Sequence, residues 1–435
     1  MIYISLGSNL GNRLENLRLA LRLLKPFFKS LSCSIILETK ALLLPGAPAA
    51  WDKPFLNMVA WGESLLSPSA MLEALKKIEH TIGRPLKYEK WAPRIIDLDI
   101  LLWGEESFET PELVVPHPQL IHRPFLLHLL GLCSPLKLHP VLQKTCGELA
   151  ASSSEEKPFE KAYSILPELI GIVNVTSDSF SDGGQFLMAD RACQQVMKLW
   201  EDGACIVEVG AQSTRPLAPL ITAEEEYARL EPVLKQLSLL LEEVIPLSID
   251  SYCDEVILKS LELFPFQWVN DVSGALKKET LKTISQRQCQ IVTMHSLSIP
   301  PTKEKVLPLR EDPFIALNKW AEEKIDYLLA CGFKEEDIIL DPGIGFGKTT
   351  YQNIYFLQQW ERRLSFKGRW MMGHSRKSYH AAFSTELAPY RDLETIATSY
   401  EVVCRTGDLL RVHNVRGHQR FFVTQDILRG GVRVL

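Results

Sequence analysis

The stretch at residues 170–184, IGIVNVTSDSFSDGG, decides how the rest of the chain is interpreted. The stretch begins within an apolar run over residues 169–175 that has the β-branched bias of a buried strand. The run breaks into a loop crowded with Thr, Ser, Asp and Gly, and Asn174 stands near the end of the strand. Because α/β proteins present their chemistry on polar loops that follow buried strands, we expect a functional site here.

Length and composition indicate a globular protein of more than one domain. The chain has 435 residues, of which 46% are hydrophobic and 23% charged. This length exceeds one ordinary hydrophobic core and predicts two or three domains, and the composition excludes a disordered chain. The net charge of −5 and the pI of about 6.1 argue against a nucleic-acid partner, since nucleic-acid-binding domains are usually strongly basic.

The cysteines and the N-terminus predict where the protein works. Nine cysteines, an odd number, form no C-x-x-C pair, which favours free thiols in a reducing compartment over disulfides or structural zinc. The N-terminus lacks the basic start of a signal peptide, and Gly7, Ser8 and Asn9 interrupt its apolar run. No apolar run has the length of a membrane span. We therefore expect a soluble cytoplasmic protein with no membrane partner.

Residues 1–150 are expected to form a first domain. Strand patterns at 1–6, 34–39, 55–61 and 95–103 mix with helical patterns that begin near Arg13, Pro68 and Pro124. Because no regular βα repeat is present, this order predicts a ferredoxin-like α+β sandwich. The Ser-rich, charged stretch AASSSEEKP at 150–158 then marks a boundary, and we place a linker at 151–162.

Residues 163–435 are expected to form a (β/α)8 TIM barrel. Eight apolar runs alternate with helix-length amphipathic segments over about 265 residues, close to the usual size of about 250 for this fold. The runs end at Asn174, Glu208, Asp250, Asn270, His295, Asp341, Gly373 and His413. The carboxyl ends of barrel strands surround the active site, so these mostly polar residues are predicted to face it.

Two carboxylates mark a candidate site in the first domain. In KWAPRIIDLDILLWG at 90–104, Asp97 and Asp99 alternate with Leu98 along a strand and so share one face, roughly 7 Å apart. Mg²⁺ prefers one or two carboxylates together with phosphate oxygens. Arg94, Lys87, Lys90, His117 and Arg123 are the basic groups available to balance phosphate charge. D-x-D alone is equally compatible with an exposed strand face that carries two solvated acids.

The wider phrase P-R-x-x-D-L-D-I-L, with VPHP downstream, resembles the signature of 6-hydroxymethyl-7,8-dihydropterin pyrophosphokinase over about residues 2–142. The resemblance implies two Mg²⁺ on Asp97 and Asp99, with Arg94 catalytic beside them. It implies that ATP is bound by Arg84, Lys90, Arg94, His117 and Arg123, and the pterin by Phe55, Asn57, Trp91 and Phe125. It also places Arg84 and Trp91 on a mobile loop. Leu86 and Ala92 depart from the usual Arg and Gly.

The second domain carries its candidates at the ends of strands. Asp250, Asn270 and Asp341 have acceptors and donors that match the aminopyrimidinone edge of a pterin. Each alone is better explained as a capped strand end or a turn, but three of them at the strand ends of one barrel favour a binding site. Arg411 and His413 follow the eighth strand and Arg376 and Lys377 the seventh, where barrels often bind phosphate.

The segment DPGIGFGKT at 341–349 resembles a P-loop at first sight. Pro342 stands where that motif needs its first Gly, and Pro supplies neither the backbone N–H nor the turn. The glycines are better explained by a backbone that passes close to a ligand.

Together, these motifs and the loops SFSDGG, STRP and GHSRKS resemble dihydropteroate synthase over about residues 168–430. The resemblance implies that Asp250, Asn270, Asp341 and Lys377 bind pterin, and that Asn174, Arg411 and His413 bind diphosphate and one Mg²⁺. Lys377, Arg411 and His413 would be catalytic. The p-aminobenzoate pocket would comprise Phe180, Asp182, Ser213, Thr214, Arg215, Pro216, Phe346 and Ser378. Glu208, Ala211, Gln212, Asn414 and the segment after His295 depart from the family pattern.

The sequence thus predicts a bifunctional enzyme of folate biosynthesis. The first domain would transfer diphosphate from ATP to hydroxymethyl-dihydropterin and release AMP, and the second would condense the product with p-aminobenzoate. Sulfonamides would compete for the aminobenzoate pocket, and the resemblance allows a homodimer formed through the outer helices of the barrel. The alternatives are a pterin-binding barrel of the methyltransferase type, against which SFSDGG and SRKS argue, and a non-catalytic scaffold, against which Arg94, Asp97 and Asp99 argue.

Overall fold

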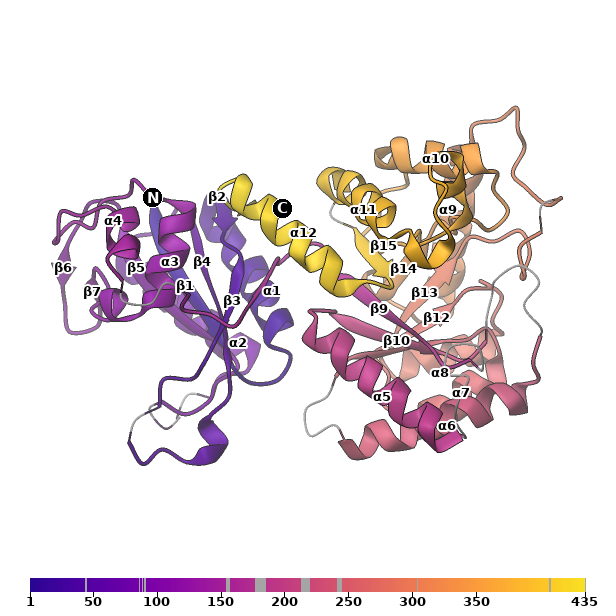
Figure 1. Ribbon diagram of the computed structural model, residues 1–435, viewed down its shortest axis with the longest axis horizontal. Coiled ribbons are helices and arrows are strands. Elements are labelled where there is room, and N and C mark those ends of the chain that lie inside the picture. The colour runs from indigo at the N-terminus through magenta and orange to yellow at the C-terminus, as the bar shows by residue number, and fades with distance from the viewer. Residues whose placement is uncertain are drawn as a thin grey trace. The chain divides into compact units, whose positions relative to one another are not determined.

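The computed structural model describes residues 1–43, 45–85, 87, 89, 91–153, 157–176, 185–212, 220–240, 245–302, 304–406 and 408–434. The chain divides into two compact units, shown in Figure 1. Unit 1 comprises Met1–Leu166 and Gln419–Leu435, and unit 2 comprises Pro167–His418. Within the described ranges, no helix combines the length and apolar character that crossing a membrane requires.

Unit 1 is built on an antiparallel sheet, which confirms the predicted α+β class. Its strands are β1 (Ile2–Ser8), β2 (Phe28–Cys33), β3 (Ile36–Thr39), β4 (Phe55–Ser64), β5 (Asp97–Trp103), β8 (Lys161–Tyr163) and β17 (Val432–Arg433). The order is β17-β2-β4-β1-β5, and β3 pairs with both β4 and β8. A separate two-stranded sheet joins β6 (Phe108–Glu109) to β7 (Val114–Val115).

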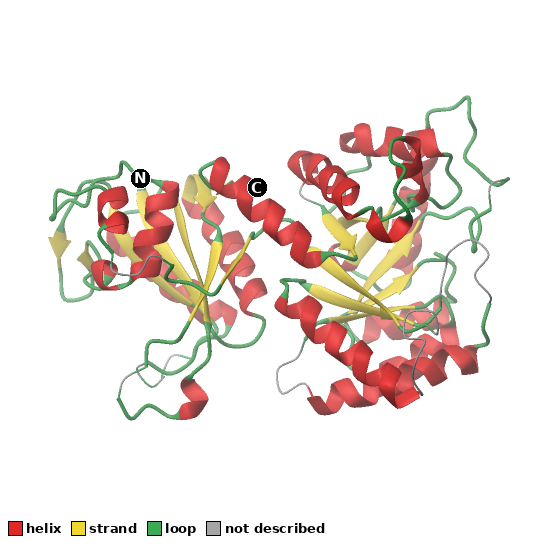
Figure 2. Ribbon diagram, in the orientation of Figure 1, coloured by secondary structure: helices red, strands yellow, loops and turns green. Residues whose placement is uncertain are grey.

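Alternation along the strands gives this sheet two apolar faces. Ile2, Ile4 and Leu6 of β1 pack with the buried leucines of α1 (Arg13–Leu24) and with α2 (Pro68–Ile82). Tyr3, on the opposite face of β1, packs with α3 (Pro124–Cys133) and α4 (Cys146–Ala151). The sheet is therefore a middle layer with helices on both sides, as Figure 2 shows.

Unit 2 is a closed parallel barrel, as predicted. Its strands are β9 (Leu169–Asn174), β10 (Ile206–Gly210), β11 (Leu247–Asp250), β12 (Trp268–Asp271), β13 (Gln290–Met294), β14 (Ile338–Asp341), β15 (Arg369–Met372) and β16 (Leu409–Val412). They are followed in turn by α5 (Gln185–Glu201), α6 (Ala223–Leu240), α7 (Asp254–Leu263), α8 (Lys278–Gln286), α9 (Pro313–Ala330), α10 (Thr350–Gln358), α11 (Asp392–Thr406) and α12 (Val415–Leu428).

The barrel interior changes from apolar to polar along the strands. One buried cluster joins strands on all sides of the barrel and includes Ile206, Trp268, Ile339 and Leu409. Side chains two residues further along a strand point the same way, so Glu208, Asn270, Asp341 and Arg411 form the next layer. The apolar layer thus closes the barrel beneath a polar one at the carboxyl ends of the strands.

The units divide the chain differently from the expected boundaries at 150 and 163. β8, which lies partly in the expected linker at 151–162, pairs with β3 in unit 1. The last residues of the chain also belong to unit 1, where β17 pairs with β2, and the division falls within α12. The composition of residues 151–162 shows that the segment is polar, but it does not show that part of it pairs with the edge of β3. The observed boundary therefore differs from the expected one.

Candidate functional sites

The face of β5 that carries Asp97 and Asp99 lies at one edge of the unit 1 sheet. The two residues pair in register with Gly7 and Ser5 of β1, and Leu98 between them is buried on the other face. Their side chains are 15% and 27% exposed. This confirms that the two carboxylates share a face, and it leaves both accessible to a ligand.

Four basic side chains surround these two carboxylates. The guanidinium groups of Arg84 and Arg94 lie 2.6 Å and 2.9 Å from the Asp97 carboxylate. Arg123 and His117 lie 3.8 Å and 4.0 Å from that of Asp99. Burial would raise the pKa of Asp97, but the charges of Arg94 and Arg84 outweigh it and lower that pKa. Three guanidinium groups thus lie close to the two carboxylates, and such donors suit the oxygens of a polyphosphate.

Arg84 is held inside the protein. Helix α2 ends at Gly83, whose φ of 115° turns the chain so that Arg84 folds back beneath the helix. Its Nη1 donates to Glu79 Oε1 at 2.6 Å, and Glu79 also accepts a hydrogen bond from the backbone N–H of Leu98. The structure thus places Arg84 behind Asp97 rather than over an open site. Lys90 and Leu86 lie outside the described residues.

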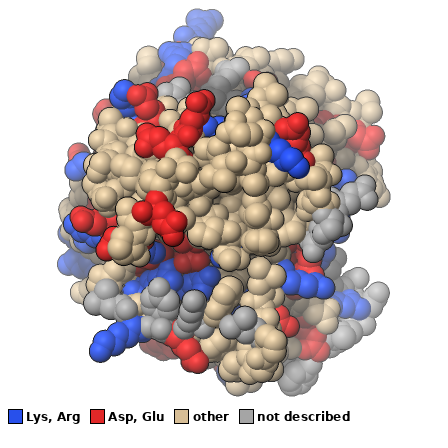
Figure 3. Space-filling model, turned by 90° about the vertical axis from the view of Figure 1, so that its left-hand side faces the viewer, with Lys and Arg blue, Asp and Glu red and all other residues tan. Residues whose placement is uncertain are grey.

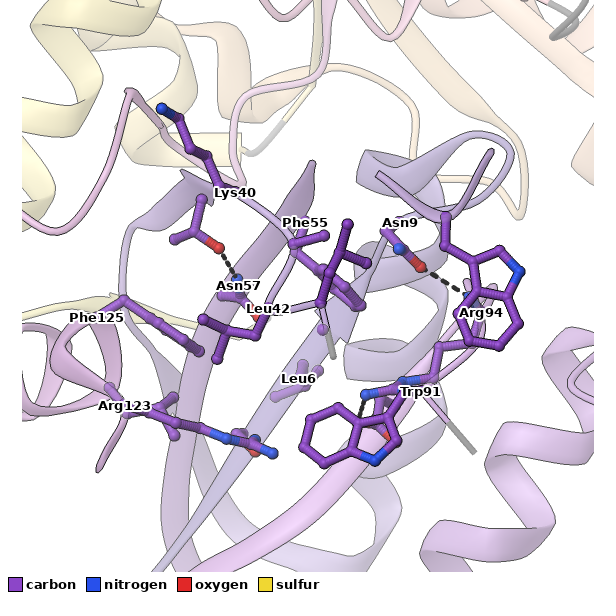
Figure 4. Close-up of a pocket in the computed structure, with 18 residues that line it drawn as sticks. Leu6, Asn9, Lys40, Leu42, Phe55, Asn57, Trp91, Arg94, Arg123 and Phe125 are labelled. Carbon is purple, nitrogen blue, oxygen red and sulfur yellow. Dashed lines mark hydrogen bonds and ion pairs between the residues drawn. The ribbon is translucent and has the colours of Figure 1, made fainter. Parts of the chain in front are cut away.

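The four residues expected to bind the pterin, Phe55, Asn57, Trp91 and Phe125, line one cavity. Figure 4 shows Phe125 and Arg123 extending into it from one side, with Trp91 on the other. Arg94 and Asp97 line the same cavity, and the Arg94 guanidinium lies 5.4 Å from the centre of the Phe55 ring. Aromatic walls and a cluster of charges thus meet in a single space.

The mouth of the barrel holds a buried ionic network. Arg411 of β16 donates from Nη2 to Asp250 Oδ2 of β11 at 2.7 Å and also pairs with Glu208 of β10. Asn270 of β12 donates from Nδ2 to Glu208 Oε2 at 2.9 Å. The structure therefore joins Asp250, Asn270 and Arg411, and it adds Glu208, which the sequence marked as a strand end and a departure but not as a site residue.

Asp341 and Lys377 complete this network on the other side of the barrel. Asp341 Oδ1 accepts from the backbone N–H of Gly343 at 2.6 Å. A Cβ at Gly373 would lie 2.9 Å from Asp341 Oδ2, so a larger residue there would displace that carboxylate. The Lys377 ammonium donates to the Ile344 carbonyl and lies 4.7 Å from the centre of the Phe346 ring.

Burial shifts the pKa values of the ionisable groups in the barrel mouth. Burial and the neighbouring Glu208 raise the pKa of Asp250 to about 8, although Arg411 opposes them. Burial also raises the pKa of Asp341. Burial lowers the pKa of Lys377 to about 8. The charge of Asp341 raises this pKa, whereas the charge of Arg411 lowers it further. Shifted pKa values of several groups in one concave site are typical of a functional site.

The predicted diphosphate residues lie at the ends of neighbouring strands. Asn174 ends β9, Arg411 lies in β16 next to it, and His413 follows β16 directly. His413 Nδ1 shares a hydrogen bond with Ser375 Oγ at 2.9 Å. Arg376 instead pairs with Asp392 at 2.6 Å, and Asn414 donates to the same carboxylate. Lys377 rather than Arg376 is therefore the cation that this loop presents.

The predicted aminobenzoate pocket is described only in part. Phe346 is buried beneath Lys377, and Ser378 is exposed at the start of a 3₁₀ helix. The remaining members lie outside the described residues: Phe180, Asp182, Ser213, Thr214, Arg215 and Pro216.

Lys348 belongs to the segment that resembles a P-loop, and its side chain points inward. Its Nζ donates to the Phe346 carbonyl at 2.9 Å and lies 2.9 Å from His295 Nδ1. Burial lowers its pKa to about 7. This buried lysine connects the loops after β13 and β14. Its inward position agrees with the prediction that the segment is not a P-loop. Sequence patterns miss such a role because they do not show which way a loop lysine points.

Both donor sets can be compared with the ligands that Mg²⁺ needs. Among the described residues, no group of three or more His, Cys, Asp or Glu side chains is arranged to hold a metal. Asp97 and Asp99 fit Mg²⁺ that takes its other ligands from phosphate and water, as is usual for this ion. In the barrel, Asn174 offers one amide oxygen at the end of β9, the strand that pairs with β16, and a single protein ligand again fits an ion that arrives with a diphosphate.

Charged side chains of both signs are mixed on one face of the molecule. On the face in Figure 3, Lys and Arg side chains are interspersed with Asp and Glu between uncharged residues. This mixture gives no broad field of one sign on that face.

Family models and relatives match both units. The model described as 7,8-dihydro-6-hydroxymethylpterin-pyrophosphokinase matches residues 3–134, and the one described as pterin binding enzyme matches residues 170–413. The folate synthesis bifunctional proteins of Chlamydia caviae and Chlamydia trachomatis serovar D are 38% and 37% identical to this chain, over 96% of it and 96% of their own length. The mitochondrial folate synthesis bifunctional protein of Pisum sativum is 32% identical, over 95% of this chain and 87% of its own.

Solved structures resemble the barrel. Xanthomonas albilineans dihydropteroate synthase with 4-aminobenzoic acid matches with a TM-score of 0.53 and 30% identity, over 60% of this chain and 91% of its own. Yersinia pestis dihydropteroate synthase in a sulfonamide complex matches with a TM-score of 0.54 and 26% identity, over 60% and 94%.

The fold and the two sites define a transferase that handles pterins at two separate places. The chain belongs to the family of folate synthesis bifunctional proteins. It has the pyrophosphokinase activity, which uses ATP, and the dihydropteroate synthase activity of folate synthesis.

Proposed function

We propose that the unit 1 cavity binds hydroxymethyl-dihydropterin beside the triphosphate of ATP. The cavity supports this because it combines the aromatic side chains of Phe55 and Phe125 with Arg94 and Asp97. Phe55, Phe125 and Trp91 would stack on the pterin ring, and Asn57 would hydrogen-bond its edge. Arg94, Arg123 and His117 would hold the phosphates. The pterin hydroxymethyl oxygen then attacks the β-phosphorus of ATP and loses its proton to water. The bond between that phosphorus and the oxygen bridging to the α-phosphorus breaks, and AMP leaves with the electron pair.

We further propose that two Mg²⁺ are held by Asp97 and Asp99 together with ATP phosphates. When bound, these ions would neutralise charge on the phosphates. Arg84 would keep the Asp97 carboxylate in place from behind, because it pairs with both Glu79 and Asp97. The protein's own contribution is mainly to position the reactants and to surround the developing charge with fixed cations.

We propose that the barrel mouth binds the pterin diphosphate. Asp250, Asn270, Asp341 and Lys377 would recognise the pterin, and Asn174, Arg411 and His413 the diphosphate with one Mg²⁺. The bond between the pterin methylene carbon and the diphosphate oxygen breaks, and the diphosphate takes its electron pair. The amine of p-aminobenzoate forms the new bond to that carbon and loses a proton. Arg411 and His413 would stabilise the negative charge on the leaving group.

The pocket beside Lys377 is proposed to bind p-aminobenzoate. Phe346 would pack on its ring and Ser378 would meet its carboxylate, together with Phe180, Asp182, Ser213, Thr214, Arg215 and Pro216. We also propose that sulfonamides compete there. A solved relative of 26% identity is described as a complex with a sulfonamide drug, which supports this.

The free cysteines bear on the cellular compartment in which the protein works. Eight cysteines among the described residues are free, which supports a reducing compartment, and we propose the cytoplasm. A pea relative is named as mitochondrial, so fractionation is the direct test. We also propose a homodimer formed through outer helices of the barrel, and light scattering of the purified chain would test it.

One assay tests both proposed sites. The full chain is mixed with hydroxymethyl-dihydropterin, ATP, Mg²⁺ and p-aminobenzoate, and both AMP and dihydropteroate are measured. We expect both products. If dihydropteroate forms only from supplied pterin diphosphate, the proposed unit 1 site is wrong. If AMP forms without dihydropteroate, the proposed barrel site is wrong.

A further inference from the structure

Glu208 connects two residues that we place at the pterin diphosphate. Its side chain is 1% exposed, and both of its oxygens have partners. Oε1 pairs with Arg411, and Oε2 accepts from Asn270 Nδ2 at 2.9 Å and from Ser248 Oγ at 3.3 Å. A carboxylate only accepts hydrogen bonds, so its position decides which atom of the Asn270 amide faces it.

Asn270 is left with one unused polar atom. The residue is 2% exposed, and its buried Oδ1 has no hydrogen-bond partner among the residues that the structure describes. Its Nδ2 is directed to Glu208, so Oδ1 is the atom presented to a ligand. A buried acceptor without a donor is costly, and a bound ligand that carries an N–H group would remove that cost.

We propose that Glu208 is a positioning residue that sets the hydrogen-bond polarity of the pterin pocket. By holding Asn270 Nδ2, it makes Asn270 an acceptor for a pterin N–H group, and through its other oxygen it holds Arg411 towards the diphosphate. This inference rests on the proposed barrel site. The longer Glu, in place of the Asp that the family resemblance suggests, reaches both partners at once.

The substitution Glu208→Gln tests the polarity directly. A Gln that keeps an oxygen on Arg411 turns its NH₂ group towards Asn270. The Asn270 amide must then flip to accept that hydrogen bond, and it presents NH₂ to the pterin N–H. We expect kcat/KM for pterin diphosphate to fall about 10- to 100-fold, because two donors then face each other in a buried site. KM for p-aminobenzoate should change less than about threefold.

A second substitution should restore the polarity. In Glu208→Gln/Asn270→Asp, one oxygen of the introduced Asp accepts from the NH₂ group of the introduced Gln, and the other again faces the pterin as an acceptor. Asn270→Asp alone places two carboxylates together and should also lose activity. We therefore expect the double variant to exceed both single variants by about tenfold or more in kcat/KM for pterin diphosphate. A residue with a merely structural role would not give this reciprocal rescue.

The full chain carries its own controls. AMP formation at unit 1 should match that of the unsubstituted chain in every variant, and thermal unfolding verifies that each barrel is folded. Glu226→Gln, at a buried carboxylate on α6 that hydrogen-bonds Ser251, serves as the matched control. Unchanged kinetics in Glu208→Gln, or a folded double variant no better than the single variants, would overturn the inference. If the unsubstituted chain made no dihydropteroate from pterin diphosphate, the proposed barrel site would fail instead.

Discussion

The two sites balance their charges in different ways. In unit 1, Asp97 and Asp99 lie on an open strand face, and the contacts to Asp99 from His117 and Arg123 are as long as 4.0 Å and 3.8 Å. In the barrel, Glu208 is buried, and both of its oxygens are engaged by protein groups. Around Asp99, the first site has long contacts that a ligand can replace, whereas the second site is organised before a ligand arrives. Substitutions around Asp99 should therefore affect activity alone, but those in the barrel mouth should affect activity and stability.

The largest expected effect is in unit 1. Asp97→Ala should lower the rate of AMP formation at least about 10³-fold, because it removes one of the proposed Mg²⁺ ligands and leaves Arg84 and Arg94 facing each other. Dihydropteroate formation from supplied pterin diphosphate should stay unchanged. Coupled assays of the two reactions measure this. The control is Glu63→Ala, which removes an exposed carboxylate paired with Lys29 on the same sheet. Equal loss in both reactions would contradict the separation of the sites.

The residues of this first site were predictable because their information is local. Asp97 and Asp99 are two residues apart on one strand, and Arg94 is three residues before Asp97, so alternation alone places them together. Glu79 was not predicted, because it reaches the site through Arg84 from a helix, and a buried polar residue on a helix gives no pattern of its own.

In the barrel, the sequence predicts the strands but not the contacts between their side chains. The eight strands and their polar ends were predicted, since the βα repeat fixes both. The partners within the mouth were not. Arg411 and Glu208 are 203 residues apart, and only barrel closure brings β16 and β10 to opposite sides of β9. For the same reason, composition at 151–162 did not reveal that β8 and β17 complete the unit 1 sheet.

Arg411→Met tests whether the two sites differ in their contribution to stability. It leaves Glu208 and Asp250 as buried carboxylates without their shared cation. We expect synthase kcat/KM to fall about 10²- to 10³-fold and the free energy of unfolding of unit 2 to fall by about 3–5 kcal/mol. Urea unfolding and steady-state kinetics measure the two effects. Arg123→Met in unit 1, beside the more exposed Asp99, should reduce AMP formation with a stability change below about 1 kcal/mol. A comparable loss of stability in both variants would remove the distinction.

The pH dependence should also separate the sites. Burial lowers the pKa of Lys377 to about 8, so its positive charge is lost as the pH rises through that value. Synthase kcat/KM should therefore fall about tenfold per pH unit above pH 8 if the charged lysine binds the pterin. Lys377→Arg should remove this alkaline limb at whatever activity it retains, because Arg stays protonated. A limb at the same pH in that variant would assign the titration to another group.

The smallest expected effect concerns His413. Ser375 Oγ shares a hydrogen bond with His413 Nδ1 at 2.9 Å, which helps to fix the orientation of the ring. Ser375→Ala removes that bond and the longer one, at 3.4 Å, that the Ser375 hydroxyl accepts from the His413 backbone N–H, so we expect synthase kcat/KM to fall only about three- to tenfold. Ser375→Thr keeps a hydroxyl and should lie between Ser375→Ala and the unsubstituted chain. Because Arg411 remains held by Glu208 and Asp250, the free energy of unfolding should change by less than about 1 kcal/mol. A loss as large as that of Arg411→Met would mean that the buried network extends to His413, and that the barrel mouth responds as one unit.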